Sequence, residues 1–167
     1  MRPTSPKFVR DLMTVGVPTC APDTKVEEIA RLLVEKNYEE VVVLEEGHNV
    51  GVVGFSELVK IYAQDNALEL TAEAVMRPGI ISVPADIPLE AAAQIMRDRG
   101  VRVLYLTHHA SGVEYPAASI SFAHLVRHMA ARNDQDLKDL GIEAARQTPL
   151  EMFLQRRDAA RRNAGQR

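Results

Sequence analysis

The sequence predicts an α/β (α+β) fold built from two βαββα repeats related by a pseudo-twofold axis, with a C-terminal helical extension. Three observations support this prediction. The chain matches itself at an offset of 63 residues, which aligns Met13 with Met76. Both copies contain an amphipathic helix with the same spacing, and in both copies two β-rich runs follow that helix. A single unit would leave one face of its sheet uncovered, so we expect the two units to cover each other.

The first helix of each copy shows helical periodicity. Apolar residues align at positions i, i+3, i+4 and i+7 in the two copies: Val26, Ile29, Ala30 and Leu33, and Leu89, Ala92, Ala93 and Met96. Thr24 and Glu27 predict a capping box at the start of the first helix. In the second copy Asp86 or the geometry of Pro88 is expected to take that role.

Each first helix is expected to end at a residue that tolerates the left-handed conformation, Asn37 or Gly100. A short strand should precede each helix, and a hairpin should follow it. The predicted strands are 18–21, 41–44 and 50–54 in the first copy, and 80–84, 103–106 and 117–120 in the second. The hairpin turns are predicted at 45–49 and 108–116.

A second helix is predicted in each copy, over 56–65 and 123–132. The resulting organisation is an N-terminal segment, two repeats and a tail, with boundaries at 1–8, 9–66, 67–132 and 133–167. In the tail, Thr148 to Glu151 form a capping box with Pro149 at the first helical position, so a helix should begin there. We expect this basic helix to pack on the module or on a dimer mate. A partner-docking or anion-binding helix is the alternative.

Composition narrows the function classes. The net charge is -3, which gives no overall attraction to nucleic acid or anionic membranes. The chain has no Trp and one cysteine, so neither base stacking on Trp nor an intrachain disulfide is expected. We recognise neither the apolar core of a signal peptide nor a run of about 20 apolar residues. These features favour a cytoplasmic protein that binds neither membrane nor nucleic acid.

The order of motifs resembles that of a CBS-domain pair, also called a Bateman module. The first copy reads LMT at 12–14, TCAPD at 19–23 and GVVGFSEL at 51–58; the second reads VMR at 75–77, SVPAD at 82–86 and ASISFAHL at 118–125. The resemblance covers residues 9–128. It implies a regulatory module without catalytic activity, a flat disk-like homodimer, and a separate effector protein that reads the ligand-dependent change.

The resemblance also implies an adenosine-containing ligand, such as AMP, ATP or S-adenosylmethionine, between the repeats, and no other cofactor. In the family, phosphate meets the start of the second helix, here Gly54 and Ser121, and ribose is bound three residues further on, here Glu57 and His124. The purine is held by the strand before the first helix and the loop after it. The corresponding residues are Thr19, Cys20 and Tyr38 in the first copy and Ser82, Val83 and Arg102 in the second.

The sequence departs from the family pattern of Thr-x-x-Asp at these helix starts. Gly54 and Glu57 stand in the first copy, and Ser121 and His124 in the second. The first copy is therefore expected to favour ribose, and the second to favour phosphate when His124 is protonated. The alternative is that Gly54, Glu57 and Ser121 only begin helices, because these residue types suit caps and first turns. The module would then be a ligand-free assembly or adaptor.

Three further features have ordinary structural explanations. His124 and His128 have the i, i+4 spacing of two metal ligands on a helix, and His108 or His109 could be a third ligand. We expect instead that His124 and His128 are solvated histidines on the helix surface. Cys20 is expected to pack as a small hydrophobe. The segment around His108 is expected to be a polar hairpin end. We recognise no nucleophile–base–acid set and no phosphate-cradling glycine loop, so the sequence does not predict an enzyme.

Overall fold

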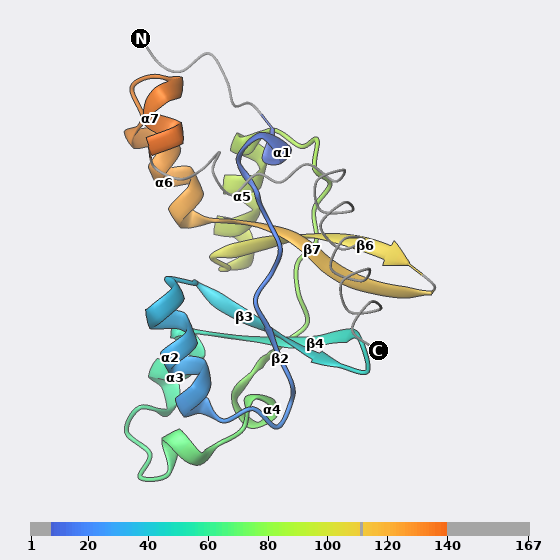
Figure 1. The fold of residues 1–167 in the computed structure, drawn as a ribbon, viewed down its shortest axis with the longest axis vertical. Helices are drawn as coiled ribbons and strands as arrows, with labels where there is room; N and C mark the ends of the chain where they lie inside the picture. Colours follow the sequence, from blue (N-terminus) through green and yellow to red (C-terminus); the bar gives the residue numbers. More distant parts are fainter. Residues whose placement is uncertain (1–7, 111, 140–167) are drawn as a thin grey trace, which may run out of the picture.

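A computed structural model describes residues 8–110 and 112–139 (Figure 1). The elements of the first half are α1 (Val9–Leu12), β1 (Thr14–Val15), β2 (Thr19–Cys20), α2 (Val26–Lys36), β3 (Glu40–Glu45), β4 (His48–Gly54) and α3 (Phe55–Ile61). The elements that follow are η1 (Ala67–Glu69), α4 (Ala72–Val75), β5 (Arg77–Pro78), α5 (Leu89–Arg99), β6 (Val103–Ala110), β7 (Val113–Ser121), α6 (Phe122–Ala130) and α7 (Asp134–Asp139). The predicted helix in the tail lies outside the described residues.

The two sheets exchange their edge strands. One sheet has the order β2-β3-β4-β5 and the other β1-β7-β6. Thus β1, which precedes the first repeat, pairs with β7 of the second repeat, and β5 pairs with β4 of the first. The pairings occupy equivalent positions, because Thr14 stands opposite Ser119 and Arg77 opposite Val52. The predicted fold class and tandem repeat are confirmed.

The short helices that precede these strands follow the same exchange. Val9 and Leu12 of α1 are buried in the core formed by α5, β6 and β7. Ala72 of α4 is buried in the core formed by α2, β3 and β4, where Met76 also packs. A boundary drawn along the sequence therefore does not separate the two cores, although it separates the two copies of the motif.

The hairpins are longer than predicted. β6 extends to Ala110 and β7 begins at Val113, so the predicted turn over 108–116 is wrong. At the first hairpin a two-residue turn leaves more of each strand free to pair, because Glu46 and Gly47 both have positive φ, as a type I′ turn requires. The predicted strand at 80–84 is also wrong. There the pairing is a single parallel bridge between Ser82 and Tyr105, which matches the Thr19–Val42 pair of the first repeat.

The helix ends are as predicted, but one start is not. Asn37 and Gly100 have φ values of 55° and 63°, which confirms both left-handed caps. Helix α2 begins one residue later than predicted, after Lys25, so the predicted capping box of Thr24 and Glu27 is wrong. The Thr24 hydroxyl instead accepts a hydrogen bond from the Ala21 N–H at 3.1 Å. In the second copy Pro88 is the cap residue, as its geometry indicated.

The second helices are shorter than predicted, because α3 ends at Ile61 and α6 at Ala130. No helix within the described part of the chain is long and apolar enough to cross a bilayer.

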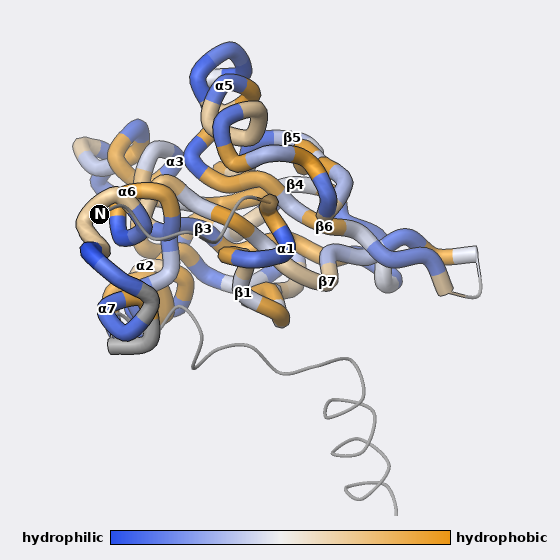
Figure 2. The backbone as a smooth tube through the Cα atoms, turned by 90° about the horizontal axis from the view of Figure 1, so that it is seen from above, coloured by the Kyte–Doolittle hydropathy of each residue, from blue (hydrophilic) through white to orange (hydrophobic). Residues whose placement is uncertain are grey.

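A third apolar cluster joins the two sheets. It contains Val42 and Val52 from one sheet and Val103 and Tyr105 from the other. Figure 2 shows hydrophobic stretches of β3, β4 and β6 running through the middle of the molecule. The face that one repeat leaves uncovered is therefore covered by the other, and the polar residues at the edge of this contact form the walls of the candidate site.

The exchange of α1 can be tested by truncating its buried leucine. Leu12 is fully buried in the second repeat's core, so Leu12→Ala should lower the free energy of unfolding by about 2–5 kcal/mol. Val34→Ala, at a position that is 72% exposed, should change it by less than about 0.5 kcal/mol. Urea denaturation measures both. If Leu12→Ala were as mild as Val34→Ala, α1 would be an appendage and not part of the core.

Candidate functional site

Two clefts open at the junction of the repeats, one beside each second helix. The α6 cleft has a volume of about 220 Å³, and its lining includes Thr14, Tyr38, Tyr105, Ser121 and His124. The α3 cleft has a volume of about 310 Å³, and its lining includes Gly54, Glu57, Lys60, Arg77 and Arg102. The clefts are equivalent in the repeat, because Gly54 and Glu57 correspond to Ser121 and His124, and Arg77 corresponds to Thr14. Glu39 and Glu40 line both clefts.

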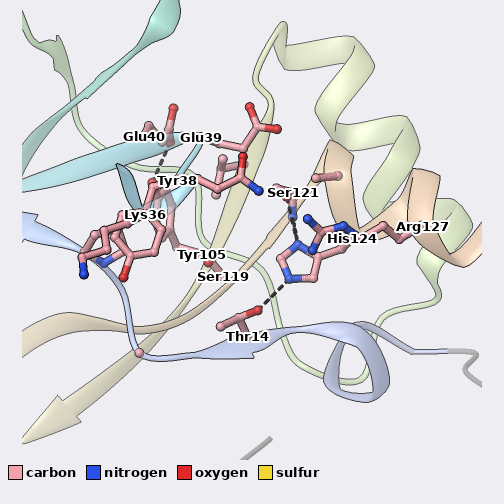
Figure 3. A pocket seen from close by; sticks show the side chains of 15 residues that line it. Thr14, Lys36, Tyr38, Glu39, Glu40, Tyr105, Ser119, Ser121, His124 and Arg127 are labelled. Atoms are coloured by element: carbon pink, nitrogen blue, oxygen red, sulfur yellow. Dashed lines mark hydrogen bonds between the residues drawn. The ribbon is translucent and has the colours of Figure 1, made fainter. Parts of the chain in front are cut away.

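His124 is fully engaged inside the α6 cleft (Figure 3). The Ser121 N–H donates to its Nδ1 at 3.1 Å, and Thr14 Oγ1 lies 2.7 Å from its Nε2. A backbone N–H can only donate, so Nδ1 accepts, and the neutral ring carries its proton on Nε2 and donates it to Thr14. Burial, helped by the nearby charge of Arg127, lowers the pKa of His124 from 6.5 to about 4. The ring is therefore neutral near pH 7, and the expected attraction to phosphate through a protonated His124 is absent at that pH.

Glu57 holds the equivalent place in the α3 cleft but is differently engaged. Its carboxylate is buried, with 4% of the side chain exposed. Oε2 accepts the Gly54 N–H at 3.1 Å, which caps α3 as His124 caps α6. Oε1 faces two cations, with Lys60 Nζ at 3.6 Å and Arg77 Nε at 3.7 Å. Gly54 and Ser121 are the cap residues of these helices, so both begin a helix as expected, and whether they also contact a ligand stays a prediction.

Gly54 cannot carry the threonine of the family pattern without a rearrangement. A Cβ added there would lie 2.9 Å from the Glu39 carbonyl oxygen and 2.9 Å from Glu40 Cβ. The close approach follows from β3–β4 pairing, because Glu40 stands directly opposite Gly54. The missing hydroxyl in this repeat therefore has a packing cause.

Glu40 lies between the two clefts. Its Oε1 accepts the Tyr105 hydroxyl at 2.7 Å and its Oε2 accepts Arg77 Nη2 at 3.1 Å. Burial raises the pKa of Glu40, while the hydrogen bond from Tyr105 and the charge of Arg77 oppose this effect. Burial, together with the charge of Glu40, also raises the pKa of Tyr105. The neighbouring Glu39 carboxylate lies 3.2 Å from Arg102 Nη2, which draws a second cation to the wall of the α3 cleft.

The residues predicted from the sequence divide into three groups. Gly54, Glu57 and Arg102 line the α3 cleft, and Tyr38, Ser121 and His124 line the α6 cleft. Thr19, Cys20, Ser82 and Val83 are not among the described residues that line either cleft. Their parallel pairings place them at the outer edge of each sheet. Whether any of these residues contacts a ligand stays a prediction.

Four residues of the site were missed at the sequence level: Thr14, Glu40, Arg77 and Tyr105. Two signals could have found them. Thr14 and Arg77 align at the offset of 63 directly after the paired methionines, and Glu40 follows Glu39 at the start of an apolar run. Neither signal reveals that the residues converge, because the convergence depends on the strand exchange.

The remaining candidates have structural roles. Cys20 packs against the first repeat's core, and burial raises the pKa of its thiol. His108 packs edge-on against Tyr115, and His109 Nε2 lies 4.0 Å from Glu114. Within 8–110 and 112–139, no three His, Cys, Asp or Glu side chains gather as a metal site.

Comparisons with known proteins point to one family. A sequence model of the CBS domain matches residues 9–64 and 72–113, more than half of the chain. No curated protein matches the sequence. The comparisons indicate no catalytic family.

Solved structures share the fold. A CBS-domain containing protein from Agrobacterium tumefaciens is 23% identical with a TM-score of 0.65, and the match covers 74% of this chain and 93% of that one. A CBS domain pair in complex with 5′-methylthioadenosine and S-adenosyl-L-methionine is 19% identical with a TM-score of 0.62, covering 73% and 98%. The CBS domain of a bacterial CNNM/CorC family Mg²⁺ transporter in complex with ATP is 21% identical with a TM-score of 0.56, covering 74% and 87%.

The lowered pKa of His124 predicts acid sensitivity. Between pH 6.5 and 4 His124 is protonated in the unfolded chain but stays neutral in the folded chain. The free energy of unfolding should therefore fall as the pH falls through this window, by up to about 3 kcal/mol. His124→Asn retains an acceptor and cannot be protonated, so the free energy of unfolding of this variant should not show that part of the fall. Urea denaturation at pH 7, 5 and 4 measures the difference, and parallel profiles for the two proteins would contradict the lowered pKa of His124.

Proposed function

The chain belongs to the CBS-domain family, and from that premise we propose that it is a cytoplasmic regulatory module without catalytic activity. It binds an adenosine-containing ligand of the AMP, ATP or S-adenosylmethionine type and passes the resulting change to a separate effector protein. The ligand acts by its different affinity for two arrangements of the repeats, since a ligand with equal affinity for both would shift nothing. Solved CBS structures in complex with S-adenosyl-L-methionine and with ATP support this ligand class.

The observation that carries the proposal is the carboxylate of Glu57 in the α3 cleft. Its Oε1 has cations nearby but no hydrogen bond among the described contacts, so it can accept from a ribose diol. Lys60, Arg77 and Arg102 line the same cleft and offer positive charge to a phosphate. The α6 cleft offers less, because both nitrogens of His124 are used within the protein. We therefore assign the ligand to the α3 cleft, with its phosphate there too, which differs from the expectation drawn from the motif alone.

A specific observation favours homodimerisation as a second role. Helix α3 exposes Phe55 and Val59, and its C-cap residue Tyr62 is exposed as well; α6 exposes the equivalent residues Phe122, Val126 and Met129. Each set follows one helical face. A twofold interface needs a surface that can pair with itself, and a face repeated on two equivalent helices meets this need. We propose that a second copy of the chain covers this face, whether or not a ligand is bound.

The ligand proposal predicts a selective response in a thermal-shift panel of AMP, ADP, ATP, S-adenosylmethionine and NAD. A ligand at about 100 times its dissociation constant should stabilise the chain by about 2.7 kcal/mol. Glu57→Gln should weaken that ligand about tenfold, because the neutral amide accepts from the diol less strongly than the carboxylate. His124→Asn, at the equivalent position, is the matched control and should bind normally. A flat response to the whole panel would favour the ligand-free adaptor.

The dimer proposal predicts that a charge on the shared face dissociates the pair. Val59→Asp should shift the monomer–dimer equilibrium at least tenfold toward monomer, because the carboxylate would be buried without a partner. Val34→Asp on α2 is the control, since Val34 and Val59 are 72% and 71% exposed. Sedimentation equilibrium of the full chain measures both. A monomeric wild-type chain, or equal behaviour of the two variants, would contradict the proposed interface.

A further inference from the structure

We propose that Glu40 couples the two clefts, so that an anionic ligand in the α3 cleft and the hydroxyl of Tyr105 in the α6 cleft influence each other. The inference rests on the proposed function of the α3 cleft. It adds a route by which a ligand in the α3 cleft changes the contacts in the α6 cleft. Glu40 lines both clefts and is only 8% exposed.

The two oxygens of the Glu40 carboxylate are committed to opposite sides. Oε1 accepts the hydroxyl of Tyr105, which lines the α6 cleft, at 2.7 Å (Figure 3). Oε2 accepts Nη2 of Arg77, which lines the α3 cleft, at 3.1 Å. A single buried group therefore forms hydrogen bonds to a wall residue of each cleft, and Tyr105 and Glu40 belong to different sheets. A change in either hydrogen bond alters the other, because both draw on the same carboxylate charge.

The repeat shows that the fold does not need this polar link. At the offset of 63, the counterparts of Glu40 and Tyr105 are Val103 and Val42, and the counterpart of Arg77 is Thr14. Val42 and Val103 pack in the apolar cluster between the sheets. The same contact is thus made by apolar residues in one copy and by a buried charge in the other. Burying an ion pair carries a desolvation cost, so its presence is weak evidence for a stabilising role and leaves room for a functional one.

Arg77 is the movable part of the link. Its guanidinium is shared between Glu40 at 3.1 Å and Glu57 at 3.7 Å, and its side chain is 31% exposed at the α3 cleft. A phosphate in this cleft competes for the guanidinium, because Arg binds phosphate as well as carboxylate in a planar fork. As Arg77 turns to the phosphate, Glu40 depends more on the Tyr105 hydroxyl. Conversely, a weaker bond from Tyr105 leaves Glu40 holding Arg77 more strongly. The coupling is reciprocal, as linkage requires.

The test measures AMP and adenosine binding to the full chain by calorimetry. Glu40→Gln should tighten AMP binding about fivefold or more, because Arg77 is no longer held by the Glu40 carboxylate. Tyr105→Phe should weaken AMP by a similar factor although Tyr105 lies in the other cleft, because Glu40 then holds Arg77 more strongly. Adenosine, which lacks the phosphate, should bind all three proteins alike. Arg77→Met should lose AMP and retain adenosine, which locates the phosphate.

Each outcome decides the inference. The opposite shifts of Glu40→Gln and Tyr105→Phe, seen with AMP only, would support it. Tyr105→Phe retains the buried ring, so it provides the test even if Glu40→Gln does not fold. Unchanged AMP affinity in Tyr105→Phe, or full AMP affinity in Arg77→Met, would overturn the coupling and leave the proposed function standing. If neither probe bound the wild-type chain, the coupling would be overturned, and the proposed function would depend on the other ligands of the panel.

Discussion

The exchange of edge strands between the two sheets is the constraint on which the rest of the structure depends. Each sheet is completed by the segment that precedes the other repeat, so neither repeat has a finished sheet or core without the other. The exchange also builds the clefts. β1 carries Thr14 to the start of α6, and β5 carries Arg77 to the start of α3. In each cleft, one wall residue therefore comes from the segment that leads into one repeat, and the start of the second helix comes from the other repeat. Any relative movement of the repeats must then alter both clefts.

Symmetry of the backbone contrasts with asymmetry of the side chains. The two sheets have equivalent pairings and equivalent bulges, between Val43 and Leu44 and between Leu106 and Thr107. On this shared frame, the helix start is capped by a neutral histidine in one cleft and by a carboxylate with two cations in the other. Such differences cost the fold little, because they lie at the rim of the sheet contact and not in its apolar centre. A duplicated frame can in this way provide two sites of different chemistry.

The sequence predicted the features that depend on local periodicity, and it missed those that depend on long-range pairing. The helical faces of α2 and α5 and the left-handed caps at Asn37 and Gly100 follow from spacing and backbone preference, and all are observed. The two-residue strands β1 and β5 have no period of their own, since a pair of residues is too short to show one. Arg77 and Thr14 could therefore not be placed. Glu40 was hidden for a related reason, because its partner Tyr105 is 65 residues away.

The helix caps and the proposed ligand site share residues, and this limits how a ligand could bind. Glu57 and His124 each fold back onto the backbone N–H of the residue that begins their helix. A ligand that displaced either side chain would leave a buried N–H without a partner, at a cost comparable to the hydrogen bond it formed. Binding that leaves the cap intact avoids this cost, and it needs a side chain with acceptor capacity to spare. A carboxylate has two oxygens and can cap and bind together, whereas a neutral imidazole has one acceptor nitrogen, which Ser121 already uses. Compared with the Asp of the family pattern, Glu57 therefore caps its helix and keeps an acceptor for the proposed ligand, whereas His124 caps its helix with its only acceptor.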